Sequence, residues 1–112
     1  MKVKVGDRVG AINGLVEKDG KKVLEIFGFG TYIGEKVPED DNVKFFGISL
    51  KEIGRANPCI LLDNGKKVYG CECWWGPEEK VKKAIEEWIK AGEVDEVVTV
   101  DIEQLRKERE EK

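Results

Sequence analysis

The sequence predicts a mainly β domain of the β-rich α+β class, built as a partly open barrel or a bent antiparallel sheet with one amphipathic helix near its C-terminal end. Three observations predict this fold. Apolar and polar residues alternate over several short segments, glycine-containing turn signals separate those segments, and only residues 81–89 show a clear helical repeat. A chain of 112 residues suffices for one core, so we expect a single globular domain over residues 1–102 and a charged helix or tail over 103–112.

The N-terminal third predicts strands. Residues 3–12 alternate valines with polar residues around a Gly-Asp turn signal. Asp19-Gly20 separates the apolar segments 15–17 and 23–27, and an Asp-Gly pair readily adopts the positive φ angles of a tight hairpin turn. We expect the second strand of this hairpin to continue through Gly28–Gly34, where the glycines allow it to bend.

The middle of the chain predicts a loop followed by more strands. Residues 35–42 are acidic and lack an apolar period, which favours an exposed loop, and residues 43–50 return to β-type spacing. Asn64-Gly65 between two apolar segments is the strongest short hairpin signal in the chain. A two-residue turn there would set Asp63 opposite Lys66, Leu61 opposite Val68, Ile60 opposite Tyr69 and Cys59 opposite Gly70.

A helix is expected over Pro77–Ala91. Proline suits the first helical position, and the two acidic residues after it complement the positive end of the backbone dipole. Gly92 ends the helix, and residues 94–102 read as a last strand. Five apolar residues form one stripe that we expect to seal the core: Val81, Ala84, Ile85, Trp88 and Ile89.

Composition narrows the class of protein. The formal charge is -3, with 20 basic and 23 acidic residues, so a general affinity for nucleic-acid backbones is not favoured. The longest uncharged stretch, Ile26–Gly34, is too short to span a membrane, and the charged N-terminus lacks the apolar run of a signal peptide. We therefore expect a cytoplasmic protein with no membrane partner. Its many Lys and Glu residues indicate a heat-adapted source.

Catalysis is the less favoured class of function. The chain contains no histidine and a single serine, Ser49, which excludes Ser-His-Asp and Cys-His nucleophiles. The remaining carboxylates, lysines and thiols form no recognisable catalytic motif. We expect a non-catalytic protein without a cofactor.

The three cysteines raise an alternative. Cys71 and Cys73 would share one face of a strand, and with Cys59 they suggest a small cysteine-based metal-binding regulator or enzyme. However, the simplest hairpin register places Cys59 on the other face. Free, buried thiols are the favoured interpretation.

The aromatic residues suggest a binding surface. Trp74 and Trp75 are adjacent in a predicted strand, so their side chains point to opposite faces, and one of them is expected to pack beneath the helix against Trp88. Aromatic residues also complete the cores of small domains, which is the competing interpretation. The candidate binding residues are Trp75, Trp74, Tyr32, Phe29 and Gly30.

Residues Val5–Ile12, Val-Gly-Asp-Arg-Val-Gly-Ala-Ile, resemble the start of small SH3-like barrels, in which a Gly-Asp turn precedes the first core strand. The resemblance implies a module that recognises peptides or nucleic acids. With the aromatic surface, it favours a recognition module for a peptide, protein or, less favoured by charge, nucleic-acid partner. A subunit of a homomeric assembly is a further alternative.

Overall fold

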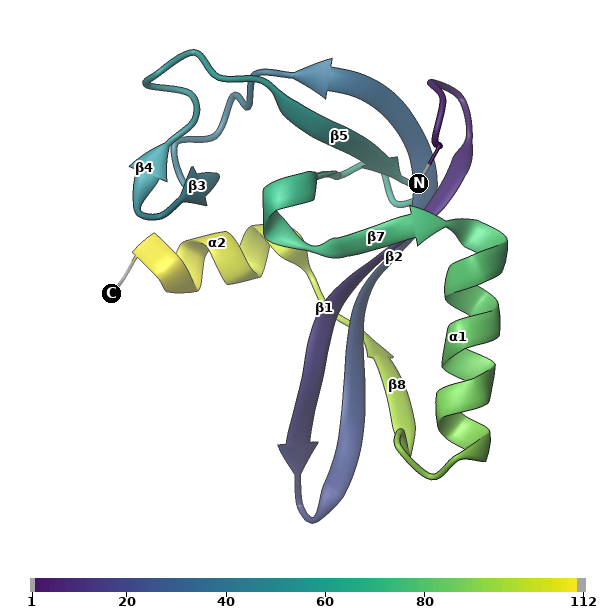
Figure 1. Cartoon of the computed structure of the whole chain (residues 1–112). Coiled ribbons are helices and arrows are strands. Elements are labelled where there is room, and N and C mark those ends of the chain that lie inside the picture. The colour runs from purple at the N-terminus through teal and green to yellow at the C-terminus, as the bar shows by residue number, and fades with distance from the viewer. Residues whose placement is uncertain (1, 111–112) are drawn as a thin grey trace.

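The computed structural model describes residues 2–110, which form an open six-stranded sheet, a separate two-stranded hairpin and two α-helices (Figure 1). This arrangement confirms the mainly β prediction, with a sheet that does not close into a barrel. The elements are β1 (Arg8–Lys18), β2 (Lys21–Lys36), β3 (Lys44–Phe45), β4 (Ile48–Ser49), β5 (Asn57–Leu62), β6 (Lys67–Tyr69), a 3-10 turn η1 (Gly70–Glu72), β7 (Trp74–Pro77), α1 (Glu78–Lys90), β8 (Glu96–Thr99) and α2 (Ile102–Glu110).

The long β1–β2 hairpin is the centre of the sheet. Its turn consists of Asp19 and Gly20, both with positive φ, as the Asp-Gly signal predicts. The main strand order is β6-β5-β2-β1-β7, with neighbouring strands antiparallel. The exception is β8, which pairs in parallel with Val23–Ile26 of β2. The glycine-rich segment belongs to β2, which confirms that the strand continues through it, and Figure 1 shows that β2 curves.

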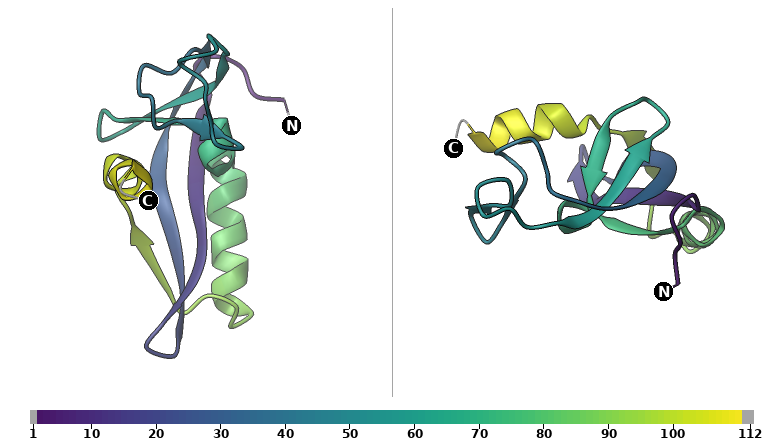
Figure 2. Two further views of the ribbon diagram at one scale, coloured as in Figure 1. Left: turned by 90° about the vertical axis from the view of Figure 1, so that its left-hand side faces the viewer. Right: turned by 90° about the horizontal axis from the view of Figure 1, so that it is seen from above.

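Two hydrophobic clusters lie on opposite faces of the β1–β2 hairpin. Val81 of α1 packs with Ile12 and Leu24 on one face, while Ile102 of α2 packs with Phe27 on the other. Figure 2 shows the two helices on opposite sides of the hairpin. The apolar stripe of α1 therefore faces the sheet, except for the exposed Ile89. Among the described residues, no helix has the length and apolar character needed to cross a membrane.

The second hairpin has a different register from the one predicted. Its loop is one residue longer, because the Leu62 N–H donates to the Lys66 carbonyl at 2.8 Å and Gly65 takes a φ of 88°. A three-residue loop ending in a left-handed glycine is a common alternative to the two-residue turn. The observed pairs are Leu61 with Lys67, Ile60 with Val68 and Cys59 with Tyr69.

Four local predictions also differ from the structure. Residues 2–7 form no strand, and residues 43–50 provide only the two short strands of the β3–β4 hairpin. Cys71 lies in η1 rather than in a strand, so the expected shared face with Cys73 does not form. Pro77 ends β7 and serves as the N-cap, and α1 begins at Glu78. The 103–112 segment lies in α2 as far as the described residues extend.

Candidate binding groove between β1 and α1

The two adjacent tryptophans point to opposite faces of β7, as strand alternation predicts. Trp74 pairs with Ile12 on the α1 side of the sheet, and Trp75 pairs with Ala11 on the α2 side. Trp75 is half-buried against the cluster that contains Phe27 and Ile102. Trp74 leaves 78% of its surface exposed. The indole available to a partner is therefore that of Trp74.

The candidate binding residues are divided between the two faces. Trp75 stacks on Tyr32, with ring centroids 5.4 Å apart and an interplanar angle of 24°. Phe29 lies on the other face, where the Lys82 Nζ is 5.3 Å from its ring centroid. Gly30 is buried where β5 approaches closely, so that a Cβ there would overlap the Leu61 carbonyl. The structure thus brings Trp75 and Tyr32 together and separates them from Phe29.

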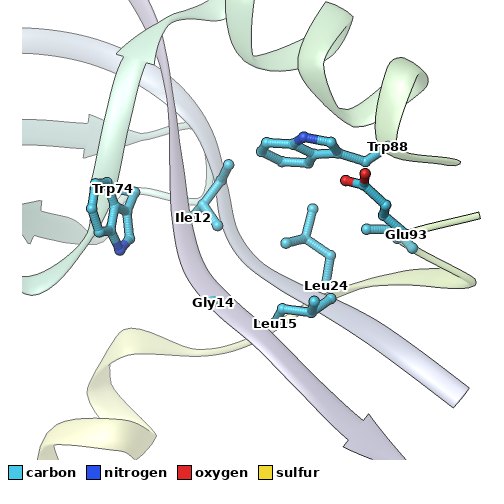
Figure 3. Close-up of a pocket in the computed structure, with 8 residues that line it drawn as sticks. Ile12, Gly14, Leu15, Leu24, Trp74, Trp88 and Glu93 are labelled. Atoms are coloured by element: carbon cyan, nitrogen blue, oxygen red, sulfur yellow. The ribbon is translucent and has the colours of Figure 1, made fainter. Parts of the chain in front are cut away.

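An apolar groove lies beside Trp74, between β1 and α1. Its main hollow has a volume of about 350 Å³ and is lined by Ile12, Gly14, Leu15, Leu24, Trp74, Trp88, Glu93 and Val94. Figure 3 shows the indoles of Trp74 and Trp88 at opposite ends, with Ile12 and Leu24 between them. A second hollow of about 300 Å³ shares Ile12 and both indoles and continues towards Lys80 and Ala84 of α1. We call the two hollows together the Trp74 groove.

The groove exists because β7 is shorter than β1. Strand β7 pairs with β1 only over Val9–Ile12, whereas β1 continues to Lys18. Among the described strands, none pairs with this edge of β1 beyond Ile12. Leu15 therefore remains 55% exposed beside the groove. Contiguous exposed apolar surface of this kind is typical of interaction sites.

The groove carries little charge. Glu93 is the charged residue lining the main hollow, and Lys80 is the charged residue lining the second, among the residues that the structure describes. One carboxylate and one ammonium provide no continuous basic track for a phosphate backbone. The lining is suited to aliphatic and aromatic side chains.

The cysteines do not line the groove. Burial raises the pKa of all three thiols, that of Cys73 to about 12. The Cys73 thiol donates to the Tyr69 carbonyl at 3.5 Å. Across residues 2–110, no three or more Cys, Asp or Glu side chains lie together in a way that could hold a metal ion.

No protein-family model, curated protein or solved structure matches the chain, so the groove is interpreted from its own geometry. The sequence indicates Trp74 as a candidate. The expected packing of one tryptophan beneath the helix against Trp88 is wrong, because Trp74 stays 78% exposed on the α1 side and Trp75 packs on the α2 side. The sequence-based prediction missed Ile12, Leu15 and Leu24. The sequence pattern of these three residues does not mark them as a site. Alternating aliphatic residues in a strand are typical of both core and surface positions, and the length of the neighbouring strand decides between them.

Proposed function

We propose that the protein is a non-catalytic recognition module that binds an extended apolar peptide segment of a protein partner in the Trp74 groove. The observation that carries this proposal is the 78% exposure of Trp74 at the end of a concave apolar surface. Tryptophan is strongly enriched among the residues that dominate binding energy at protein interfaces. Its large, rigid ring gives contact area at a small loss of conformational entropy.

The backbone beside the groove supports an extended ligand. Residues 13–18 of β1 present an edge that the described strands leave unpaired. A peptide in β-conformation would continue the line of β7 and exchange main-chain hydrogen bonds with Gly14–Glu17. Alternate side chains of that peptide would then enter the groove near Leu15. A helical ligand would leave these backbone groups without protein partners.

Charge favours a peptide over nucleic acid. The chain has a formal charge of -3, and Glu93 would repel a phosphate at the main hollow. The absence of histidine from the sequence and the high pKa of the thiols favour binding over catalysis.

The proposal is tested by panning a displayed library of random peptides on the wild-type protein, with counter-selection on Trp74→Ala. We expect enriched peptides to contain alternating aromatic or aliphatic residues. They should bind Trp74→Ala and Leu15→Lys at least about tenfold more weakly, the loss of one interface anchor. Ile53→Lys is the matched control, because Ile53 is also 55% exposed but lies outside the groove.

Amide hydrogen exchange gives a second readout. A peptide bound as an added strand should slow exchange at β1 amides in Gly14–Glu17 that face the open edge. The proposal is wrong if no groove-dependent peptide is enriched, or if the enriched peptides bind Trp74→Ala and Leu15→Lys as tightly as the wild type.

A further inference from the structure

The β3–β4 hairpin has an unusual turn. Its two central residues are Phe46, with a φ of 52°, and Gly47, with a φ of 77°, between the paired residues Phe45 and Ile48. Positive φ at both central positions strongly favours Asn-Gly or Asp-Gly. The β1–β2 hairpin of the same chain follows this rule with Asp19 and Gly20. The second turn departs from it by placing a phenylalanine in the left-handed region.

The left-handed turn exposes two adjacent aromatic rings, those of Phe45 and Phe46, which we call the Phe45–Phe46 knob. Phe46 is 89% exposed, and its ring lies 4.4 Å from that of Phe45 in an edge-to-face arrangement. A left-handed conformation is strained for a non-glycine residue, because its Cβ approaches the neighbouring carbonyl oxygen. Burial of the ring does not offset this strain, because Phe46 is hardly buried, and the ring contact with Phe45 lies within the same exposed turn. Strain of this kind at an exposed residue points to function.

The Trp74 groove has the size and charge to receive this knob. An apolar cavity of about 150 Å³ can hold one benzene ring. The main hollow is about 350 Å³, which is room for the paired rings of Phe45 and Phe46. The hairpin also carries the exposed Lys44 beside Phe45, and Glu93 lies in the wall of the hollow. The main hollow therefore has the volume and the apolar lining for the two rings, and its Glu93 carboxylate is opposite in charge to Lys44.

The two features do not cover each other within one molecule. Phe46 and Trp74 both remain largely exposed, and the hairpin lies beside α2 whereas the groove opens beside α1 (Figure 1). A contact between them therefore requires two copies of the chain.

We propose that the Phe45–Phe46 knob of one copy inserts into the Trp74 groove of a second copy. This inference rests on the proposed function, because it uses the same groove. The contact joins two different surfaces, so it is head-to-tail and produces rings or chains of copies rather than a two-fold dimer. Self-association would compete with peptide for the groove and would regulate its availability through protein concentration.

Two substitutions test the knob and the groove separately. Phe46→Asn removes the knob with a residue that the turn favours, and Trp74→Ala disables the groove at an exposed position. In sedimentation velocity from low micromolar to millimolar concentration, the wild type should increase in average mass while each variant stays monomeric. An equimolar mixture of the variants should form heterodimers and stop there, because it contains one intact knob and one intact groove.

Three results would overturn the inference. These are a wild type that stays monomeric throughout, a Phe46→Asn variant that associates like the wild type, and a mixture that does not associate. Phe46-dependent sedimentation of a monomeric wild type with phosphatidylcholine vesicles would instead assign the knob to a lipid surface. If selected peptides bind in a Trp74-dependent manner while the wild type is monomeric, only this inference fails. If no groove-dependent peptide is found either, the proposed function fails with it.

Discussion

Arg106 in α2 donates two hydrogen bonds to the carboxylate of Glu72 in η1, at 2.6 Å and 2.9 Å. The pair is enclosed, with the Glu72 side chain only 1% exposed. The Tyr69 N–H also donates to this carboxylate at 3.0 Å, and Arg106 donates to the Lys67 carbonyl. The C-terminal helix is thereby connected to the end of the second hairpin by polar contacts as well as by its apolar residues.

Removing one member of this pair should strongly destabilise the fold. Arg106→Met leaves the Glu72 charge buried without its main partner, and we expect a loss of about 3–5 kcal/mol in the free energy of unfolding. Urea unfolding measures the change. Lys107→Met is the control at an exposed neighbour and should change stability by less than about 0.5 kcal/mol. A loss below about 1 kcal/mol for Arg106→Met would contradict the buried pairing.

Gly30→Ala should destabilise the protein through the backbone of β5. The added Cβ would overlap the Leu61 carbonyl and approach the Leu62 Cα to 2.7 Å, so two paired strands must separate. We expect a loss of about 3 kcal/mol, measured as a lower urea midpoint. Gly70→Ala is the comparison, because its nearest contact is the Trp75 side chain at 3.1 Å and a smaller adjustment suffices. Equal losses for the two variants would argue against close strand approach at Gly30.

The pH dependence of stability should include a contribution from Arg8. Its guanidinium bonds to Asp63 at 2.7 Å and to Glu78 at 3.2 Å, which lowers the pKa of both carboxyls in the folded state. Their unfolded pKa values are about 3.9 and 4.3. The stabilisation is therefore fully present above about pH 5 and is lost as the pH falls through the lower folded values.

Arg8→Gln should accordingly lower stability at pH 7 and lose less than the wild type on acidification. Thermal unfolding at pH 7 and near pH 3 measures this difference. Arg55→Gln, at an exposed loop position, should keep the wild-type pH dependence. Parallel pH profiles for wild type and Arg8→Gln would exclude the contribution.

Phe46→Asn should stabilise the isolated protein. Asparagine tolerates the left-handed conformation that phenylalanine resists, so we expect a gain of about 1 kcal/mol in a chemical-unfolding experiment under monomeric conditions. Phe45→Asn should give no such gain, because Phe45 lies in β3 and does not have positive φ. A less stable Phe46→Asn would show that the ring contact with Phe45 outweighs the strain.

The thiols should react slowly in the folded protein. Their raised pKa values leave little thiolate near pH 8, and we expect alkylation by iodoacetamide at least about tenfold slower than after unfolding in guanidinium. Mass spectrometry of partly modified protein gives the rate at each cysteine. One thiol that reacts rapidly in the folded state would restore a chemical role for the cysteines.

Local patterns were sufficient for much of the fold. The stripe from Val81 to Trp88 contains the helix residues that face the sheet. Asp19-Gly20 forms the tight turn between β1 and β2, as its sequence predicts. The register of the second hairpin was not predictable from the Asn64-Gly65 signal. In the observed three-residue loop Asp63 is not opposite Lys66, and it binds Arg8, 55 residues away in sequence. Such a long-range ion pair leaves no trace in local periodicity.

The site was predictable only in part. Alternation correctly separated Trp74 from Trp75, but it could not show which indole would remain exposed. That depends on how far α1 and α2 cover the two faces of β7, and on β7 ending beside Ile12. The parallel pairing of β8 likewise depends on where α1 returns the chain, which a pattern of valines does not specify.

The placement of β8 has a consequence for synthesis. Val23 of the β1–β2 hairpin pairs with Glu96 of β8, and the ribosome adds Glu96 73 residues after Val23. At about 5–20 residues per second, that interval lasts roughly 4–15 seconds. Throughout it, the nascent hairpin carries one bare edge at its turn end, and the same stretch of β1 stays bare on the other side. An unpaired edge of this kind is a template for pairing with another chain, so β8 protects the hairpin once it is in place.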